Sequence, residues 1–341
     1  MIWFKFVLCL AVILFAGTKL AQYGDAIAEK TGLGRIWIGL VLIAVITTMP
    51  ELVTSVSSVA LVPVVGQDDP ARLADLALGT LLGSCCFNLS ILAVLDILYS
   101  RTPVLSVASP RHVITAGWGA LLIALAAASI IAGGRFSFLA LGWVGIPSIV
   151  ILLLYLLGMW WIFRRERGQR LHTAPTTALQ YDKVTTRTVW IRFALAAAAV
   201  IAAGIWLSFI GDEISRTTGW GGTFVGSLFL AITTSAPELV VAITALRMGA
   251  VDLAVADILG ANMLDIAMIV PVDLAQGQGF VLSSVSRGNL IVASVAVMMS
   301  LLVMAGLRFR RRRKVFRVFS WYTPLLIALY ILGAYALFTW A

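Results

Sequence analysis

Long apolar segments are the feature of this sequence that most restricts its fold. A soluble domain carries about 25% charged residues, whereas this chain carries 12% and has a mean hydropathy of +1.00, so most of its surface must face something other than water. A membrane helix needs about 20 apolar residues. Ten segments meet that need, at about 3–22, 35–62, 73–99, 111–132, 136–163, 190–210, 221–248, 252–275, 287–306 and 318–340. The expected fold class is an all-α polytopic membrane protein.

The longest hydrophilic stretch divides these segments into two groups of five. We therefore expect a first half at 1–163, a cytoplasmic linker at 164–189 and a second half at 190–341. The first apolar segment has a counterpart in the second half, which argues against reading it as a cleaved signal peptide. The three cysteines lie in apolar stretches and indicate no disulfide framework, and the neighbours Cys85 and Cys86 are interpreted as small packing residues.

The basic residues set the expected orientation. With the N-terminus outside, 20 Lys and Arg residues fall in inside loops and 5 fall outside, a strong positive-inside bias. Ten spans then place both termini outside a plasma (inner) membrane. The net charge of +9 is thus explained by topology and not by nucleic acid binding. The expected partners are the lipid bilayer and inorganic cations, and no protein partner is implied.

Two stretches of the sequence repeat one another. Residues 47–53 match 234–240, and residues 75–77 match 252–254; isolated matches include Asp96 with Asp273. The two copies, at about 35–99 and 221–275, begin five spans apart. Because five is odd, the second copy enters the membrane in the opposite direction. The sequence therefore predicts two inverted five-helix repeats, an architecture typical of secondary transporters with a site between the halves.

Each copy places a Pro-Glu pair inside an apolar span. Glu51 and Glu238 would lie at membrane depth, where a charged side chain costs about 3 kcal/mol or more and usually faces a functional cavity. The preceding proline cannot donate a backbone hydrogen bond, so the carbonyl one turn earlier, at Ile46 or Thr233, is expected to be released. Carboxylates and free carbonyls are the hard oxygen ligands that Ca²⁺ prefers.

Further polar residues recur at helical spacing around these glutamates. Thr47 and Thr234 lie one turn before them, on the same helix face. A single Thr, Ser or Asn in a span more often joins helices than binds an ion, but the repetition favours a shared site. The following span adds polar or acidic residues at intervals of four, which are Thr80, Ser84 and Asn88 in the first copy and Asp257 and Asp265 in the second.

At these residues the sequence resembles the cation/Ca²⁺ exchanger superfamily, which includes the sodium/calcium exchangers. That family carries two repeats, each with a Thr-Ser-x-Pro-Glu element and a downstream Gly-Asn-x-x-Gly-Ser-Asn-x-x-Asn element. The resemblance implies that helices 2, 3, 7 and 8 form the ion-binding core, and that helices 1 and 6 slide across it. The ion ligands it implies are Glu51, Glu238, Thr47, Thr48, Thr234, Ser235, Ser84, Asn88 and Asp265.

Four positions depart from the family pattern. Thr80 and Asp257 replace the first Asn of each downstream element, Cys85 replaces a middle Asn, and Ala261 replaces a Ser that would line a sodium site. The resemblance therefore implies a weakened peripheral Na⁺ site in the second repeat. Thr80 and Asp257 stay candidate ligands. With Asp257, up to four carboxylates face one cavity, and their mutual repulsion favours retention of a proton.

The leading functional prediction is an antiporter that exchanges Ca²⁺ for Na⁺ by alternating access, which Asp265 favours because sodium-coupled relatives also carry an acid there. The alternative is a Ca²⁺ (or other divalent cation)/H⁺ exchanger, which Asp257 and Ala261 favour. A non-transporting scaffold leaves two costly buried acids unexplained. An enzyme is not expected, because the sequence lacks a metal-binding His cluster, a nucleophile with a base and a phosphate-binding loop. No cofactor is expected.

Overall fold

The protein is described by a computed structural model. The described residues are 2–31, 38–60, 70–99, 102–133, 140–141, 143–170, 185–218, 228, 230–277, 280–310, 314 and 318–340. Several features of the sequence lie outside them, including Arg35, most of the expected linker, four arginines of the basic stretch at 308–317, and the glycines at 32, 34, 219, 221 and 226 that match between the repeats.

Nearly all of the described chain is helical. The first half contains α1 (Ile2–Thr31), η1 (Ile38–Ile43), α3 (Ala44–Thr47), α4 (Met49–Ala60), α5 (Pro70–Leu98), α6 (Val104–Val107), α7 (His112–Ala132), β1 (Ala140–Leu141), β2 (Val144–Gly145) and α8 (Ile146–Arg170). The second half contains α9 (Thr186–Thr218), α11 (Ala231–Thr234), α12 (Ala236–Arg247), α13 (Val251–Ala267), α14 (Ile269–Gln276), α15 (Val281–Ser284), α16 (Gly288–Arg308) and α17 (Thr323–Trp340).

These elements follow the ten predicted segments. Among the described residues, seven helices are long and apolar enough to cross a membrane by themselves, and the bent pair Ile38–Thr47 and Met49–Ala60 forms an eighth crossing with a bend of 41°. The segments α11–α12 and α17 occupy the two remaining positions and are apolar but shorter. The all-α polytopic fold predicted from hydropathy is thus confirmed.

The fifth predicted segment begins later than expected. The prediction started the helix near residue 136, but α8 starts at Ile146, after a two-residue antiparallel pairing of β1 with β2. Pro147 near the first position of α8 explains the start, because proline suits the first turn of a helix and disfavours the turn before it. A Cβ at Gly145 would overlap the Phe280 ring, so glycine is required for this close packing. The last helix likewise starts at Thr323 and not at 318.

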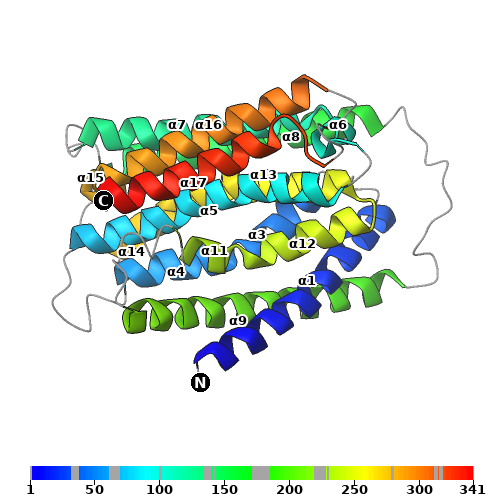
Figure 1. The fold of residues 1–341 in the computed structure, drawn as a ribbon, viewed down its shortest axis with the longest axis horizontal. Coiled ribbons are helices and arrows are strands. Elements are labelled where there is room, and N and C mark those ends of the chain that lie inside the picture. The colour runs from blue at the N-terminus through cyan, green and yellow to red at the C-terminus, as the bar shows by residue number, and fades with distance from the viewer. Residues whose placement is uncertain are drawn as a thin grey trace.

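The helices form layers, as Figure 1 shows. α1 and α9 lie against one another along one side of the molecule and contact the next layer through α12 and α4. That next layer holds η1, α3, α4, α11 and α12. The long helices α5 and α13 form the middle, and α7, α8, α16 and α17 cover the far side. The broken helices therefore lie between the α1–α9 pair and the central helices.

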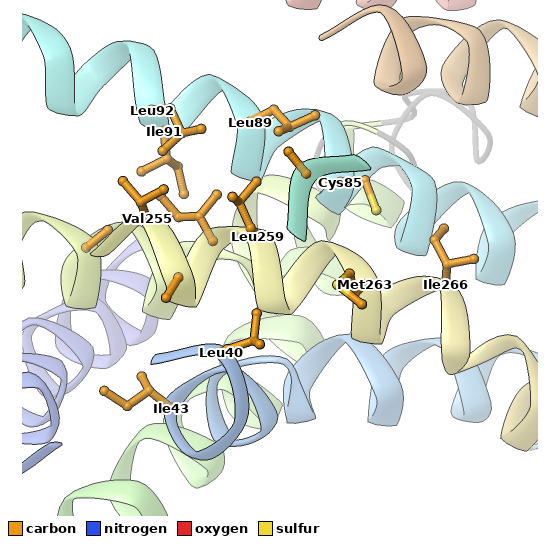
Figure 2. Close-up of a cluster of buried hydrophobic side chains, with 14 of the residues drawn as sticks. Leu40, Ile43, Cys85, Leu89, Ile91, Leu92, Val255, Leu259, Met263 and Ile266 are labelled. Atoms are coloured by element: carbon orange, nitrogen blue, oxygen red, sulfur yellow. The ribbon is translucent and has the colours of Figure 1, made fainter. Parts of the chain in front are cut away.

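The centre of the fold is the contact between α5 and α13, which are equivalent in the two repeats. Their apolar side chains meet in the buried cluster of Figure 2, which includes Leu89 and Leu259. Cys85 and Asn262 are also repeat equivalents, and the Asn262 side-chain amide donates to the Cys85 carbonyl at 3.3 Å. Two equivalent residues touch in this way only near the pseudo-two-fold axis that relates the repeats, so this contact marks that axis.

Two equivalent aspartates fasten each repeat to the other. Asp75 at the start of α5 accepts hydrogen bonds from the Ser286 N–H at 2.6 Å and the Asn289 amide at 2.8 Å, in the second half. Asp252 at the start of α13 accepts from the Ser109 N–H at 2.6 Å and His112 Nε2 at 3.0 Å, in the first half. These reciprocal contacts join the start of α5 to the start of α16 and the start of α13 to the start of α7.

A second pair of equivalent aspartates holds the far ends of the same spans. Asp96 accepts the N–H of Val104 at 3.0 Å and both the N–H and hydroxyl of Ser320 at 2.8 Å. It also accepts the hydroxyls of Tyr322 at 2.8 Å and Thr323 at 2.6 Å. These five bonds satisfy a fully buried carboxylate, which would otherwise be costly.

Asp273 accepts fewer hydrogen bonds than Asp96. It accepts the Val281 N–H at 2.8 Å and the Gly145 N–H at 3.2 Å. Val104 and Val281 each lie eight residues after their aspartate, so both carboxylates fix the short helix that follows, α6 or α15. The unassigned sequence matches Asp75–Asp252 and Asp96–Asp273 are thereby explained as structural anchors.

Candidate cation site

Both Pro-Glu elements lie at a break in a helix. α3 ends at Thr47 and α4 begins at Met49, with Thr48 between them at φ −82° and ψ 1°. α11 ends at Thr234 and α12 begins at Ala236, with Ser235 between them at φ −85° and ψ 10°. The same break in both repeats follows from the proline that comes two residues after each break, since proline cannot continue the hydrogen-bond ladder.

The residue at each break still donates its backbone N–H to a carbonyl one turn earlier. The Thr48 N–H bonds to the Ala44 carbonyl at 3.0 Å, and the Ser235 N–H bonds to the Ala231 carbonyl at 3.0 Å. The release of the carbonyls of Ile46 and Thr233, which the prolines favour, stays a prediction.

Glu51 joins the two repeats. Its side chain is fully buried, and its Oε1 accepts a hydrogen bond of 2.7 Å from the Ser235 hydroxyl at the break of the other repeat. The second carboxylate oxygen, Oε2, has no hydrogen-bond partner. The hydroxyls of Thr234 and Ser84 lie close to the same carboxylate.

Glu238 is less well satisfied than Glu51. It is also fully buried, and neither of its carboxylate oxygens has a hydrogen-bond partner. Its carboxylate lies within electrostatic range of Glu51, Asp257 and Asp265. Carboxylates that share a buried region repel one another, so this arrangement requires cations or protons for neutrality.

The central helices place polar groups beside these glutamates. Ser84 and Asn88 on α5 are fully buried, and the Ser84 hydroxyl and both polar atoms of the Asn88 amide have no hydrogen-bond partner. Asp265 on α13 is fully buried and has one unpartnered oxygen, Oδ1. Buried polar atoms are normally paired, so a group of unpaired ones at the predicted site indicates that a ligand belongs there.

The predicted threonine ligands are bonded to their own helices. The hydroxyls of Thr47, Thr48, Thr80 and Thr234 donate to backbone carbonyls three or four residues earlier, at 2.7–3.3 Å. A hydroxyl that donates its hydrogen keeps two lone pairs, so these oxygens can still face a cation. Their assignment as ion ligands stays a prediction.

Asp257 lies at the edge of this group. It is fully buried on α13, and neither carboxylate oxygen has a hydrogen-bond partner. A Cβ at Gly39 would collide with the backbone of residues 253 and 257, so η1 approaches α13 closely there. Of the other acids in this group, Asp257 is within electrostatic range of Glu238.

Four buried acids thus face a common region without basic partners. Within the described part of the chain, Glu51, Glu238, Asp257 and Asp265 form no ion pair with Lys, Arg or His. Among the same residues, no three His, Cys, Asp or Glu side chains converge closely enough to form a metal cluster. A cation in this region would therefore need hydroxyl, amide or carbonyl oxygens together with the carboxylates, as Ca²⁺ commonly does.

Cys85 is interpreted from the sequence as a packing residue, and its side chain is fully buried in the cluster where α5 and α13 meet. Its Sγ also lies 3.8 Å from Asp265 Oδ2, a contact that the sequence interpretation did not include. A signal was present in the sequence, because Cys85 directly follows Ser84 and occupies a position where the family pattern has a polar amide. For Cys86 the packing interpretation agrees with its surroundings, since its Sγ faces the Val292 carbonyl.

The fold and this buried polar region define a multi-pass α-helical membrane protein built from two inverted repeats, with the features of a secondary transporter. The comparison with protein families is more specific. The family described as "Sodium/calcium exchanger protein" matches residues 1–164 and 188–341. The chain therefore belongs to this family of cation/Ca²⁺ exchangers, which are transporters and not enzymes.

Two relatives agree with this assignment. The chain is 26% identical over 314 residues to the "Putative antiporter CaxA" of Alkalimonas amylolytica, with 91% of each chain covered. It is 23% identical over 267 residues to the "Inner membrane protein YrbG" of Escherichia coli (strain K12), with 76% of this chain and 75% of the relative covered.

Solved structures show the same fold. Structures of the sodium-calcium exchanger NCX_Mj soaked with 2.5 mM Na⁺ and 0.1 mM Ca²⁺, or with 2.5 mM Na⁺ and 10 mM Sr²⁺, superpose with TM-scores of 0.71 and 0.72. They cover 97% and 98% of this chain, at 18% identity. The ten-helix inverted-repeat arrangement predicted from the sequence agrees with this likeness.

Proposed function

We propose that this protein exchanges Ca²⁺ for Na⁺ across the membrane by alternating access, with Glu51 and Glu238 as the central ligands. The observation that carries the proposal is the group of buried polar atoms without partners, in which both oxygens of Glu238 and one of Glu51 take part. One Ca²⁺ neutralises two of the four acids, and two Na⁺ ions do the same. With protons on the other two acids, either occupancy would leave the site neutral and permit it to be buried during the switch between inward and outward states.

The remaining ligands in this proposal come from both repeats. Thr47, Thr48, Ser84 and Asn88 would contribute from the first half, and Thr234, Ser235 and Asp265 from the second. Thr80 and Asp257 would extend the site. The bond between Ser235 and Glu51 supports a site shared by the repeats, because it already joins two proposed ligands from opposite halves.

The location and organisation in this proposal follow the sequence. We place the protein in the plasma (inner) membrane with both termini outside, on the basis of the basic residues in inside loops. The Escherichia coli relative, an inner membrane protein by name, supports that membrane. The division into 1–163, 164–189 and 190–341 also stays a prediction; α8 extends to Arg170 and α9 begins at Thr186, so both helices continue into the expected linker.

The proton-coupled alternative has its own support. Ala261 supplies no hydroxyl at a position where the family pattern has Ser, and Asp257 adds a buried carboxylate with no hydrogen-bond partner. A carboxylate that no cation reaches is neutralised most simply by a proton. In that case the protein exchanges Ca²⁺, or another divalent cation such as Mn²⁺ or Mg²⁺, for H⁺.

Transport in liposomes separates these functions. Uptake of ⁴⁵Ca²⁺ is measured with an outward Na⁺ gradient, an outward H⁺ gradient or neither, for the wild type, Glu51→Gln and the control Ser129→Ala, whose hydroxyl bonds only within its own helix. The proposal expects Na⁺-driven uptake that Glu51→Gln abolishes and the control retains. Uptake driven only by H⁺ assigns the alternative, and no uptake by folded protein under any gradient would contradict both.

Asp265 tests the coupling ion directly. In the family pattern, sodium-coupled members carry an acid at this position and proton-coupled members more often carry Asn. We therefore expect Asp265→Asn to remove Na⁺-driven ⁴⁵Ca²⁺ uptake more strongly than any H⁺-driven component. Equal loss of both components would show that Asp265 serves Ca²⁺ binding and does not select the coupling ion.

A further inference from the structure

A sulfur atom lies beside an acid of the proposed cation site. Cys85 on α5 lies within the cluster where α5 and α13 meet (Figure 2), and its Sγ is 3.8 Å from Asp265 Oδ2 and 3.7 Å from the Asn262 carbonyl oxygen. Its own carbonyl accepts the Asn262 amide at 3.3 Å. The thiol is therefore held in place by its backbone, near the pseudo-two-fold axis.

The two residues that contact this sulfur also carry unpartnered oxygens. Asp265 Oδ1 and Asn262 Oδ1 are buried and have no hydrogen-bond partner, and both residues are almost completely inaccessible to solvent. The Cys85 sulfur and the oxygens of Asp265 and Asn262 thus offer donors of mixed hardness. Such a set is unlike an all-oxygen site, because thiolate sulfur selects softer metal ions than carboxylate and carbonyl oxygens do.

We propose that Cys85 and Asp265 form a subsite that binds a thiophilic divalent cation such as Cd²⁺. The cation would bind sulfur as the thiolate, since a coordinating thiol loses its proton, and that proton leaves to water. The Asp265 carboxylate and the Asn262 oxygens complete the coordination. The alkaline-earth ions gain little from sulfur, so this subsite favours Cd²⁺ over Ca²⁺.

The other two cysteines provide matched controls. Cys86 is the next residue on the same helix, but its Sγ faces the Val292 carbonyl at 3.5 Å and lines an apolar cavity with Gly83, Val295 and Tyr330. Cys9 is buried against the Ala203 carbonyl at 2.9 Å. Among the described residues neither thiol bonds to a carboxylate, so neither should bind Cd²⁺ in the folded protein.

A spectroscopic titration tests the subsite without transport. Purified protein in detergent is titrated with CdCl₂, and the ultraviolet charge-transfer absorbance of a thiolate–cadmium bond is recorded for the wild type, Cys85→Ser, Cys86→Ser and Asp265→Asn. We expect the band in the wild type and Cys86→Ser and its loss in Cys85→Ser. Asp265→Asn should weaken Cd²⁺ binding by about tenfold or more, as loss of a supporting group does in other metal sites.

Several results would overturn the proposal. The proposal fails if the wild type shows no band or if the band persists in Cys85→Ser. It also fails if Cys86→Ser loses the band as completely as Cys85→Ser does. Size-exclusion profiles and thermal unfolding show whether each variant is folded, and Cys85→Ala replaces Cys85→Ser if the latter is not. The subsite does not depend on the coupling ion of the proposed function, so the band is expected even if Ca²⁺ uptake fails.

A transport measurement adds a second readout where ⁴⁵Ca²⁺ uptake is present. Cd²⁺ can also compete with Ca²⁺ at carboxylates, so inhibition by itself does not identify a thiol. The subsite predicts that the Cd²⁺ concentration for half inhibition rises by about tenfold in Cys85→Ser but not in Cys86→Ser. Equal inhibition of all three proteins would contradict a role for the Cys85 sulfur.

Discussion

The two repeats have the same backbone plan but different chemistry at matching positions. Both break a helix before Pro-Glu, and both anchor their third span with equivalent aspartates. The polar residues of the central helices differ, because Ser84 and Asn88 of the first repeat correspond to Ala261 and Asp265 of the second. The residues that shape the backbone, which are the prolines and the anchoring aspartates, are therefore the same in both repeats. The acidic side chains of the site lie mostly in the second repeat.

The glutamates differ in the same way. Glu51 accepts a hydrogen bond from Ser235, but the equivalent partner of Glu238 would be Thr48, whose hydroxyl donates to Ala44 at 2.7 Å instead. The structure is therefore asymmetric although its repeats are equivalent. In an inverted-repeat transporter the two halves exchange roles between inward and outward states. The asymmetry at these hydroxyls is what such an exchange would reverse.

The largest expected effect comes from the central acids. Glu51→Gln and Glu238→Gln should each reduce ⁴⁵Ca²⁺ uptake by about 100-fold or more, because each removes a charged ligand of one shared site. Both should also lose the Ca²⁺-dependent rise in melting temperature that ligand binding produces. A variant that retains both the uptake and the Ca²⁺-dependent melting temperature would show that its glutamate is not a central ligand. Glu51 and Glu238 would then not be functionally equivalent.

The anchors at the far ends of the spans should differ in stability. Asp96→Asn places an amide N–H₂ against buried donors and should lower the free energy of unfolding by about 3 kcal/mol or more. Asp273→Asn disturbs fewer hydrogen bonds and should lower the free energy of unfolding by about 1–2 kcal/mol. Thermal unfolding in detergent compares them. Equal losses of unfolding free energy would mean that the two aspartates stabilise the fold equally despite their different contacts.

The hydroxyls at the helix breaks sharpen the comparison further. Ser235→Ala removes the bond to Glu51 and should weaken Ca²⁺ binding by about fivefold, the equivalent of about 1 kcal/mol. Thr48→Val should have a smaller effect on binding in this state, since its hydroxyl bonds within its own helix. Isothermal titration measures both. A larger effect of Thr48→Val would indicate that the alternate state, with Glu238 partnered, dominates in solution.

The smallest expected effect concerns the cross-repeat contacts. His112→Asn gives the Asp252 contact the same residue type that Asn289 supplies to Asp75, so it should change the free energy of unfolding by less than about 1 kcal/mol. His112→Ala removes the donor to Asp252 and should cost about 1–2 kcal/mol. Thermal unfolding of the two variants decides between them. Equal losses would show that the asparagine does not reach Asp252 at this position.

Much of the fold could be predicted because membrane helices depend on local composition. The ten apolar segments correspond to the described helices, and the Pro-Glu pairs mark the two that are broken, although the sequence predicts only released carbonyls there. The start of α8 is predicted too early, since residues 136–163 form one apolar run and only the pairing of β1 with β2 shows that the described part before Ile146 is not helical. The contact of Cys85 with Asp265 could not be predicted, because a thiol in an apolar run is equally suited to packing.

The sequence by itself determined the membrane setting, the inverted repeat and the acids that must be neutralised. Each follows from properties of single segments: hydropathy, spacing and the cost of a charge at membrane depth. Only the tertiary structure decided which residues meet, such as Ser235 with Glu51, Cys85 with Asp265, and Asp252 with His112. These contacts join residues at least 140 positions apart, and no local pattern encodes them, because they depend on how the helices pack.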